Sequence, residues 1–212
     1  YMLVNHPIIL KTQSLLRRKV IGDINFVRAE CGFYLPNWHP WEDYRKFYMA
    51  HKNQGGGVLL DTSHEINYLQ RLFGQVKNIQ GLVGKFSNLK ISSDDLALSI
   101  INFKKNNVVG QIHLDLMQFE KSRNFKIIGT KGVIEGCLVT NKIKVFYNNK
   151  KKKVEKKLNY NFNKIYFTQL RQFWSLQKNK KNNLCTGEEA YHTMQIIEGI
   201  RKSNKSGKKV SI

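Results

Sequence analysis

The chain has 212 residues, 41% of them hydrophobic, and a formal net charge of +21. This length supports one sizeable hydrophobic core, and with only 3 Pro and 15 Gly no linker-like segment divides the chain. No stretch reaches the roughly 18 apolar residues that span a bilayer, and the start has no signal-peptide layout, so we expect a cytoplasmic protein without a membrane partner. The first residues, Tyr1-Met2-Leu3-Val4, resemble an internal segment of a longer sequence. We therefore expect residues 1–212 to form one domain of a longer protein.

The excess of positive charge raises nucleic acid as a partner class. Lysine supplies 28 of the 36 cations, however, whereas arginine is favoured for phosphate and base recognition. The lysines also fall in separate runs between asparagines, at Lys150–Lys153, Lys178–Lys181 and within Arg201–Lys209. Solvated turns account for such runs equally well, so nucleic-acid binding is not the favoured interpretation.

The first elements are a helix, a strand and a long loop. Asn5 can cap a helix that has Pro7 in its first turn and that ends before Gly22. Ile24–Tyr34 alternates as a strand does. Leu35–Gln54 predicts an irregular loop that is dense in aromatic and charged residues. A loop of this length in a compact domain is usually functional or disordered, and its tryptophans argue for order and function.

A glycine triplet, Gly55–Gly57, opens the next predicted helix, Gly57–Phe73, which Gly74 ends. Glycine lets the backbone come close to another group and leaves the first helical N–H groups unblocked. Asp61 and His64 are three residues apart, so on one helix they share a face. A carboxylate beside an imidazole is an arrangement that transfers protons, although a capped turn with a satisfied histidine remains an alternative.

A series of strands follows, joined by short, turn-rich connections that favour antiparallel pairing. The predicted strands are Val76–Phe86, Leu96–Phe103, Val108–Met117, Asn124–Ile128, Val133–Val139 and Ile143–Tyr147. Two helices come next, and the first has one stripe of Tyr166, Leu170, Phe173 and Trp174. Ala190, Met194 and Ile197 mark the second helix, with Ile196 and Ile200 beside them, before a final strand Lys209–Ile212. Helices and sheet in separate blocks predict an α+β fold, a large and mostly antiparallel sheet with helices packed on one face.

Aromatic and basic residues gather in the long loop, where they are candidates for substrate binding. Tryptophan and tyrosine faces stack on sugar rings, and an arginine forks onto phosphate or carboxylate. The alternative is a packed surface loop that covers the sheet. The candidates are Trp38, His39, Trp41, Tyr44 and Arg45.

His113 is a further candidate for substrate binding, because it and Asp115 lie on one face of a predicted strand. That face either lines a pocket or is the solvated side of the sheet. The six histidines show no zinc-type spacing, so no metal site is predicted. Three cysteines without a CxxC pair predict reduced thiols.

The chain resembles the C-terminal domain of the Gfo/Idh/MocA family of NAD(P)-dependent sugar oxidoreductases. Three stretches carry the resemblance: Gly-Gly-Gly-x-x-x-Asp with its histidine and Leu72-Phe73-Gly74, then Arg123 through Glu135, then Glu188 through Val210. The loop Tyr34–Arg45 is similar to a branch associated with nucleotide sugars and surface polysaccharides. Two departures stand out, since the histidine follows the acid by three residues rather than four and Asn67 replaces a further acid.

The resemblance implies an N-terminal Rossmann domain that binds NAD or NADP, and neither a GxGxxG fingerprint nor that domain is in this sequence. It implies that His64 exchanges the proton of a sugar hydroxyl while hydride moves to or from the cofactor, with Asp61 assisting. Tyr1 and Met2 would lie near the nicotinamide, and the open face of the sheet would join subunits into a homo-oligomer. The rival interpretations are a basic module for nucleic acid or acidic polysaccharide, and a non-catalytic relic of the family.

Overall fold

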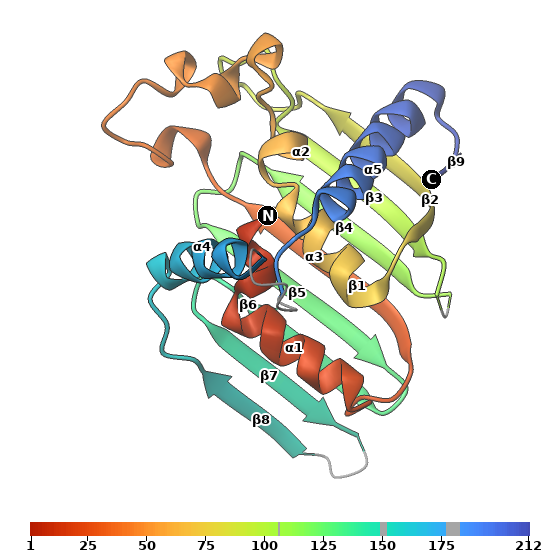
Figure 1. The fold of residues 1–212 in the computed structure, drawn as a ribbon. Coiled ribbons are helices and arrows are strands. Elements are labelled where there is room, and N and C mark those ends of the chain that lie inside the picture. The colour runs from red at the N-terminus through yellow and green to blue at the C-terminus, as the bar shows by residue number, and fades with distance from the viewer. Residues whose placement is uncertain (106, 149–151, 177–182) are drawn as a thin grey trace.

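The computed structural model describes residues 1–105, 107–148, 152–176 and 183–212. Among these residues, one nine-stranded sheet has the order β8-β7-β6-β5-β1-β4-β3-β2-β9 (Figure 1). The strands are β1 Ile24–Gly32, β2 Val76–Gly84, β3 Leu96–Phe103, β4 Val109–Asp115, β5 Ser122–Gly129, β6 Gly132–Cys137, β7 Lys142–Tyr147, β8 Lys152–Lys157 and β9 Val210–Ser211. The predicted α+β class and the large sheet are confirmed.

The sheet is antiparallel at every pairing except one. β1 pairs in parallel with β4, with Ala29 opposite Ile112, and antiparallel with β5, with Ala29 opposite Phe125. β1 therefore joins two antiparallel blocks, β2 to β4 on one side and β5 to β8 on the other. Such a mixed sheet buries one face against helices and leaves the other face open to solvent.

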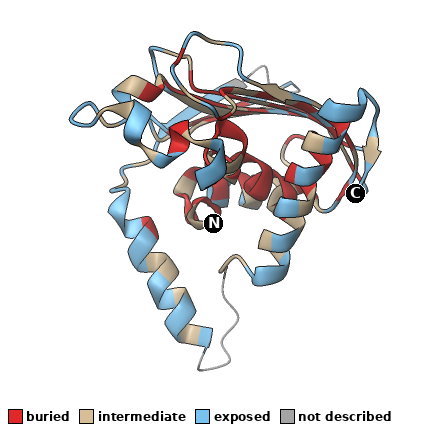
Figure 2. Cartoon of the chain, turned by 90° about the horizontal axis from the view of Figure 1, so that it is seen from above, coloured by how far each residue is buried: buried red, intermediate tan, exposed pale blue. Residues whose placement is uncertain are grey.

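The α-helices lie on one side of the sheet, where the buried residues are concentrated (Figure 2). Their bounds are α1 Pro7–Arg17, α2 Val58–Asp61, α3 His64–Phe73, α4 Asn163–Leu176 and α5 Gly187–Ser206. The core uses the inward residues of the strands, such as Val27, Ile112 and Ile127, against Ile66 and Ile197 of the helices. No helix among the described residues is long and apolar enough to cross a membrane.

Several local predictions need correction. The cap of α1 is His6, whose ring accepts a hydrogen bond from the backbone of Ile8, whereas the Asn5 side chain pairs with Gln172 of α4. Strand β8 was missed, because a segment made almost wholly of lysine shows no apolar alternation. The long loop holds four short 3-10 helices, Leu35–Asn37, Tyr44–Lys46, Tyr48–Ala50 and Lys52–Gln54.

The apolar faces of the last two helices also differ from expectation. Ile165 is the buried residue of α4, and the predicted stripe is exposed, with Leu170 63% and Trp174 66% accessible. In α5 the buried face carries Ile196, Ile197 and Ile200, while Met194 is exposed. The lysine run 178–181 and part of the run 150–153 lie outside the described residues.

Candidate active site

The glycine triplet shapes the entrance to α2 by close contact with the protein itself. A Cβ on Gly56 would meet the backbone oxygen of Tyr48 at 2.3 Å, and one on Gly57 would meet Asp94 at 2.4 Å. Gly57 also has φ of +111°, a conformation that side chains disfavour. The first N–H groups of α2 donate to Asp94, Val58 to its backbone oxygen and Leu59 to its carboxylate, each at 2.9 Å. They are therefore not open to a ligand.

The predicted helix Gly57–Phe73 is broken between Asp61 and His64. The Thr62 hydroxyl donates back to the oxygen of Val58 at 2.5 Å, and the Ser63 hydroxyl donates to that of Leu60 at 2.7 Å. Side-chain hydroxyls that bond to preceding carbonyls compete with the helix and bend it. α2 ends at Asp61 and α3 begins at His64, so the two residues do not share one helical face as expected.

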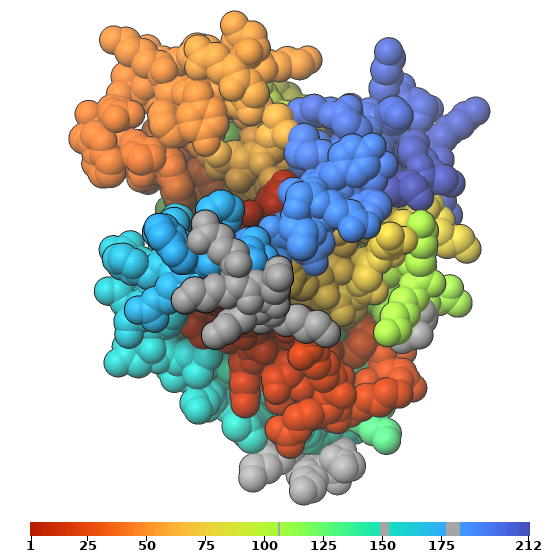
Figure 3. Space-filling view, in the orientation of Figure 1, coloured from red at the N-terminus to blue at the C-terminus, as the bar shows by residue number. Residues whose placement is uncertain are grey.

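Asp61 and His64 nevertheless line the same cavity, which has a volume of about 410 Å³. It lies under the long loop and beside α4, and Figure 3 shows the surface hollowed there, with N-terminal residues (red) between the loop (orange) and α4 (cyan to blue). Its lining combines apolar walls with titratable groups: Met2, Leu3, Cys31, Phe33, Trp38, Asp61, Thr62, His64, Lys121, Arg123, Leu138, Val139, Phe162 and Tyr166.

His64 is a mostly buried, neutral histidine. Burial, together with the positive charge of Arg123, lowers the pKa of its ring to about 3. Its Nδ1 atom is buried and has no hydrogen-bond partner among the described residues, and the residue lines the cavity. The Tyr1 ring packs edge-on against the imidazole, with 5.3 Å between ring centres.

Asp61 pairs with a loop tyrosine instead of the histidine. The hydroxyl of Tyr48 donates a short hydrogen bond to Asp61 Oδ1, and burial raises the pKa of that carboxyl. Tyr48 is itself 42% exposed, so this pair connects the cavity wall to solvent.

A buried ion pair that sequence reasoning missed lies next to the histidine. Arg123 Nε and Nη2 donate to the two carboxylate oxygens of Glu65 at 2.8 and 3.0 Å. Glu65 is fully buried on α3, directly after His64, and Arg123 is in β5. The sequence signal for this pair is an arginine at an inward position of a strand. A buried charge requires a partner, so such an arginine predicts a nearby carboxylate. The pair fixes α3, and therefore His64, against the sheet.

Among the predicted loop residues, Trp38 lines this cavity. Its ring stacks on Phe33 at 4.5 Å, and Lys121 Nζ lies 4.4 Å from the centre of the Trp38 ring. This cation–π contact places an ammonium group at the mouth of the cavity. Lys121 was not predicted, because a lysine in a connection between strands carries no distinctive signal.

The other four loop candidates lie outside the lining of the cavity. Arg45 forks onto the neighbouring Asp43 through Nε and Nη2, which lowers the pKa of that carboxyl to about 2. His39 packs between Trp41 and Phe47, and Trp41 is 73% exposed. The Tyr44 hydroxyl accepts a hydrogen bond from the backbone of Lys90. This half of the loop matches the alternative of a packed surface loop.

His113 lies on the open face of the sheet, away from the cavity. Its Nε2 is 3.1 Å from Asp115 Oδ2, and this contact raises the pKa of the imidazole. No group of three or more metal-binding side chains converges among the residues that the structure describes.

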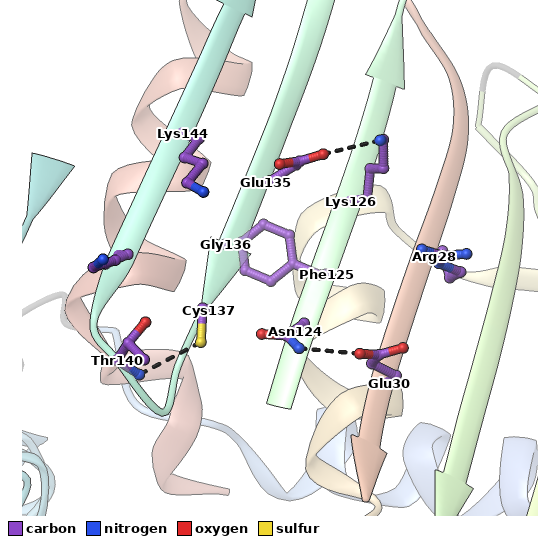
Figure 4. A pocket seen from close by; sticks show the side chains of 11 residues that line it. Arg28, Glu30, Asn124, Phe125, Lys126, Glu135, Gly136, Cys137, Thr140 and Lys144 are labelled. Carbon is purple, nitrogen blue, oxygen red and sulfur yellow. Dashed lines mark hydrogen bonds and ion pairs between the residues drawn. The ribbon is translucent and has the colours of Figure 1, made fainter. Parts of the chain in front are cut away.

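A second cavity, of about 310 Å³, lies on the open face over β1, β5, β6 and β7 (Figure 4). Several of its polar groups already have partners: Lys126 pairs with Glu135 at 2.9 Å, and the Asn124 amide donates to Glu30 at 3.0 Å. Lys142 and Lys144 pair with Glu155 of β8. The described lining of this cavity has no histidine, so the cavity beside His64 is the stronger candidate for proton transfer.

Comparisons with known proteins agree with this architecture. Residues 13–212 match the family model described as "Oxidoreductase family, C-terminal alpha/beta domain", that of Gfo/Idh/MocA proteins. A comparison of the sequence with curated proteins found no match.

Solved structures share the fold at low sequence identity. Levoglucosan dehydrogenase in complex with NADH is 14% identical with a TM-score of 0.83, and the match covers 100% of this chain and 64% of that one. An aldose–aldose oxidoreductase from Caulobacter crescentus is 14% identical with a TM-score of 0.83, and the match covers 100% of this chain and 62% of that one. An NAD-binding oxidoreductase from Klebsiella pneumoniae is 15% identical with a TM-score of 0.81, and the match covers 100% of this chain and 65% of that one. The chain thus spans less than two thirds of these proteins, and it belongs to the Gfo/Idh/MocA oxidoreductase family as a C-terminal domain.

Proposed function

We propose that this chain is the substrate domain of an NAD(P)-dependent oxidoreductase that interconverts a secondary hydroxyl and a ketone on a sugar or nucleotide sugar. The observation that carries the proposal is a neutral imidazole that lines a cavity of about 410 Å³ with aromatic walls. Solved proteins of the same fold are named for sugar oxidation or bind NADH. A role in surface polysaccharide synthesis, and a nucleotide as part of the substrate, belong to the same proposal.

His64 would act as the base when the alcohol is oxidised. Its lowered pKa keeps the ring neutral at physiological pH, which leaves one ring nitrogen with a lone pair for the hydroxyl proton. Arg123 makes the imidazolium unfavourable, which promotes the return of that proton when the ketone is reduced. Asp61 and Tyr48 form a hydrogen-bonded pair from the cavity wall to solvent, and we assign them the passage of the proton to bulk water.

We place the nicotinamide end of the cofactor at this cavity and the rest of the cofactor on another domain. Met2 and Trp38 offer apolar surface beside His64, and Tyr1 contacts the imidazole. The sequence holds no glycine-rich fingerprint for a pyrophosphate. When bound, the nicotinamide would accept or donate the hydride, and the side chains of this chain would orient the sugar and hold the proton.

We place the cofactor domain ahead of Tyr1, next to α4. The Asn5 side chain pairs with Gln172 of α4, so the N-terminus and this helix lie side by side. Phe167, Leu170 and Phe173 of α4 are all more than 60% exposed, and a second domain would cover them.

The open face of the sheet is the surface that we assign to subunit contact. Helices leave this face bare (Figure 2), and Leu82, Ile100 and Phe146 are 41–52% exposed on it. Lysines on the same face pair with glutamates, as Lys126 does with Glu135 and Lys144 does with Glu155. A nucleic-acid surface needs unpaired cations in a row, so these pairs favour protein contact over nucleic acid.

The decisive test is a His64→Ala substitution in the protein as its gene encodes it. Turnover is followed at 340 nm with NAD⁺ or NADP⁺ and a panel of levoglucosan, L-sorbose, D-glucose and UDP-N-acetylglucosamine. Loss of the base should lower kcat by about 10²–10⁴-fold and leave cofactor binding intact. His192→Ala, which removes a histidine on α5 outside the cavity, is the matched control and should keep full activity. Unchanged turnover in His64→Ala would remove this residue from the chemistry and favour a non-catalytic relic.

A further inference from the structure

One end of the His64 cavity holds hydrogen-bond donors that no described residue satisfies. Arg123 uses Nε and Nη2 on Glu65, and no described residue accepts from Nη1. The Arg123 side chain is only 15% exposed, and the residue lines the cavity. A guanidinium carries five N–H donors in a rigid fork, so the Nη1 pair is left for a group inside the cavity.

Lys121 extends this positive end to the mouth of the cavity. It precedes Arg123 by two residues, and both line the cavity. No described carboxylate forms an ion pair with Lys121, which instead rests on the Trp38 ring with its side chain partly exposed. An ammonium that contacts an aromatic face still has N–H donors on its other side for a third partner.

The cavity contains little negative charge to balance these cations. Asp61 is the one carboxylate among its described lining residues, and it accepts from Tyr48 rather than from either cation. Burial raises the pKa of the Asp61 carboxyl. Glu65 neutralises Arg123 from the far side and does not line the cavity. One net positive charge therefore remains at the end formed by Lys121 and Arg123.

We propose that the substrate is a sugar with an anionic group, a carboxylate or a phosphate, that binds between Lys121 Nζ and Arg123 Nη1. This inference rests on the proposed function for its sugar part and adds the class of sugar. Charge-assisted hydrogen bonds from two cations hold such a group in one orientation. Trp38, Phe162 and Tyr166 supply flat walls for the sugar ring, and the hydroxyl that reacts points to His64.

Trp38 provides a direct probe of this site, because Lys121 contacts its ring. The natural protein is labelled with 5-fluorotryptophan, and Trp38→Phe identifies the Trp38 signal in ¹⁹F NMR spectra. D-glucuronate, D-glucose 6-phosphate, D-glucose and inorganic phosphate are titrated at low ionic strength. We expect at least one of the two anionic sugars to shift the Trp38 signal with a Kd about tenfold or more below that of glucose. A comparison of glucuronate with glucose 6-phosphate shows whether the site binds a carboxylate or a phosphate.

Lys121→Met should abolish the preference for the anionic sugar, and Lys121→Arg should retain it. Lys90→Met, a lysine outside the cavity lining, is the matched control. Equal affinity for glucose and both anionic sugars, or an unaltered preference in Lys121→Met, would overturn the inference, as would inorganic phosphate that binds as tightly as the sugar phosphate. Failure of the proposed function is a separate result: the anionic sugar would still bind with the stated preference, yet His64→Ala would turn over normally.

Discussion

The His64 side chain shows how burial sets the chemistry of one residue. The fold places its Nδ1 where no described group and no solvent can reach it, and the Arg123 charge lies near. Both effects disfavour the protonated ring, so the imidazole is uncharged at neutral pH. His113 has the opposite environment, since the Asp115 carboxylate favours its charged form. Two histidines in one fold therefore differ in the direction of their pKa shifts.

These opposite shifts predict opposite effects on acid stability. The folded-state pKa of His64 is about 3 against 6.5 when unfolded, so its contribution is complete above pH 6.5 and is lost as pH falls toward 3. His64→Gln should therefore reduce the loss of unfolding free energy between pH 7 and pH 5, by up to about 1.4 kcal/mol per pH unit below pH 6.5. Urea unfolding of the variant and the wild type at pH 7 and pH 5 measures this difference in unfolding free energy.

His113→Gln is the paired control for that measurement. The folded-state pKa of His113 is raised, so its contribution is present below pH 6.5 and is lost as pH rises through the folded value. Its removal should make the protein lose more stability on acidification than the wild type. Equal pH dependence in the His64→Gln variant and the wild type would contradict the buried neutral ring.

Sequence patterns identified part of this site, and tertiary contacts determined the rest. Asp61, His64 and Trp38 were found because glycine, acid, histidine and tryptophan are distinctive in local sequence, and all three line one cavity. Arg123 and Lys121 were missed, since their importance comes from a partner 58 residues away and from a ring on another loop. The predicted Asp61–His64 pairing failed because two hydroxyl groups break the helix between them.

At the scale of elements, the turn before α2 depends on glycine for two separate reasons. Gly57 combines φ of +111° with an Asp94 oxygen 2.4 Å from its missing Cβ. The same aspartate caps α2, so a side chain here would displace both the cap and Asp61 at the end of that helix. The sequence predicted the close approach correctly, but the approaching group is the protein's own backbone and carboxylate.

Gly57→Ala should therefore destabilise the protein by about 2 kcal/mol or more, because strain at positive φ adds to a steric clash. Denaturant unfolding monitored by circular dichroism measures this difference. Gly187→Ala, at the first turn of α5 with open space around the Cβ, should be neutral or slightly stabilising. Equal stability of the two variants would show that the turn tolerates a side chain.

At the scale of the whole molecule, the strand order was less accessible to sequence than the strands themselves. Most strands were found from alternation, and short connections correctly gave antiparallel neighbours such as β2 with β3 and β5 with β6. The parallel pairing of β1 with β4 was not predicted, because no local pattern records which distant strand lies beside β1. The edge strand β8 was not predicted either, because its charged sequence shows no alternation of apolar residues.

The bare sheet face predicts the assembly state. If subunits join through this face, Leu82→Lys with Ile100→Lys should convert the oligomer to a monomer, because two charges replace apolar side chains that are about half exposed on it. Light scattering after gel filtration measures the mass. Leu10→Lys on α1, where the side chain is 39% exposed, is the matched control on the helical side and should not change it. A wild-type protein that elutes as a monomer would contradict the assignment.

The position of β1 also has a consequence for synthesis on the ribosome. Within this domain β1 is the first strand made, yet both of its neighbours, β4 and β5, begin only at Val109 and Ser122. Until then its two hydrogen-bonding edges are unprotected, and contacts so distant along the chain form slowly. The nascent polypeptide should therefore depend on chaperones until β4 and β5 have been made, and cells that express it fast should collect it in inclusion bodies.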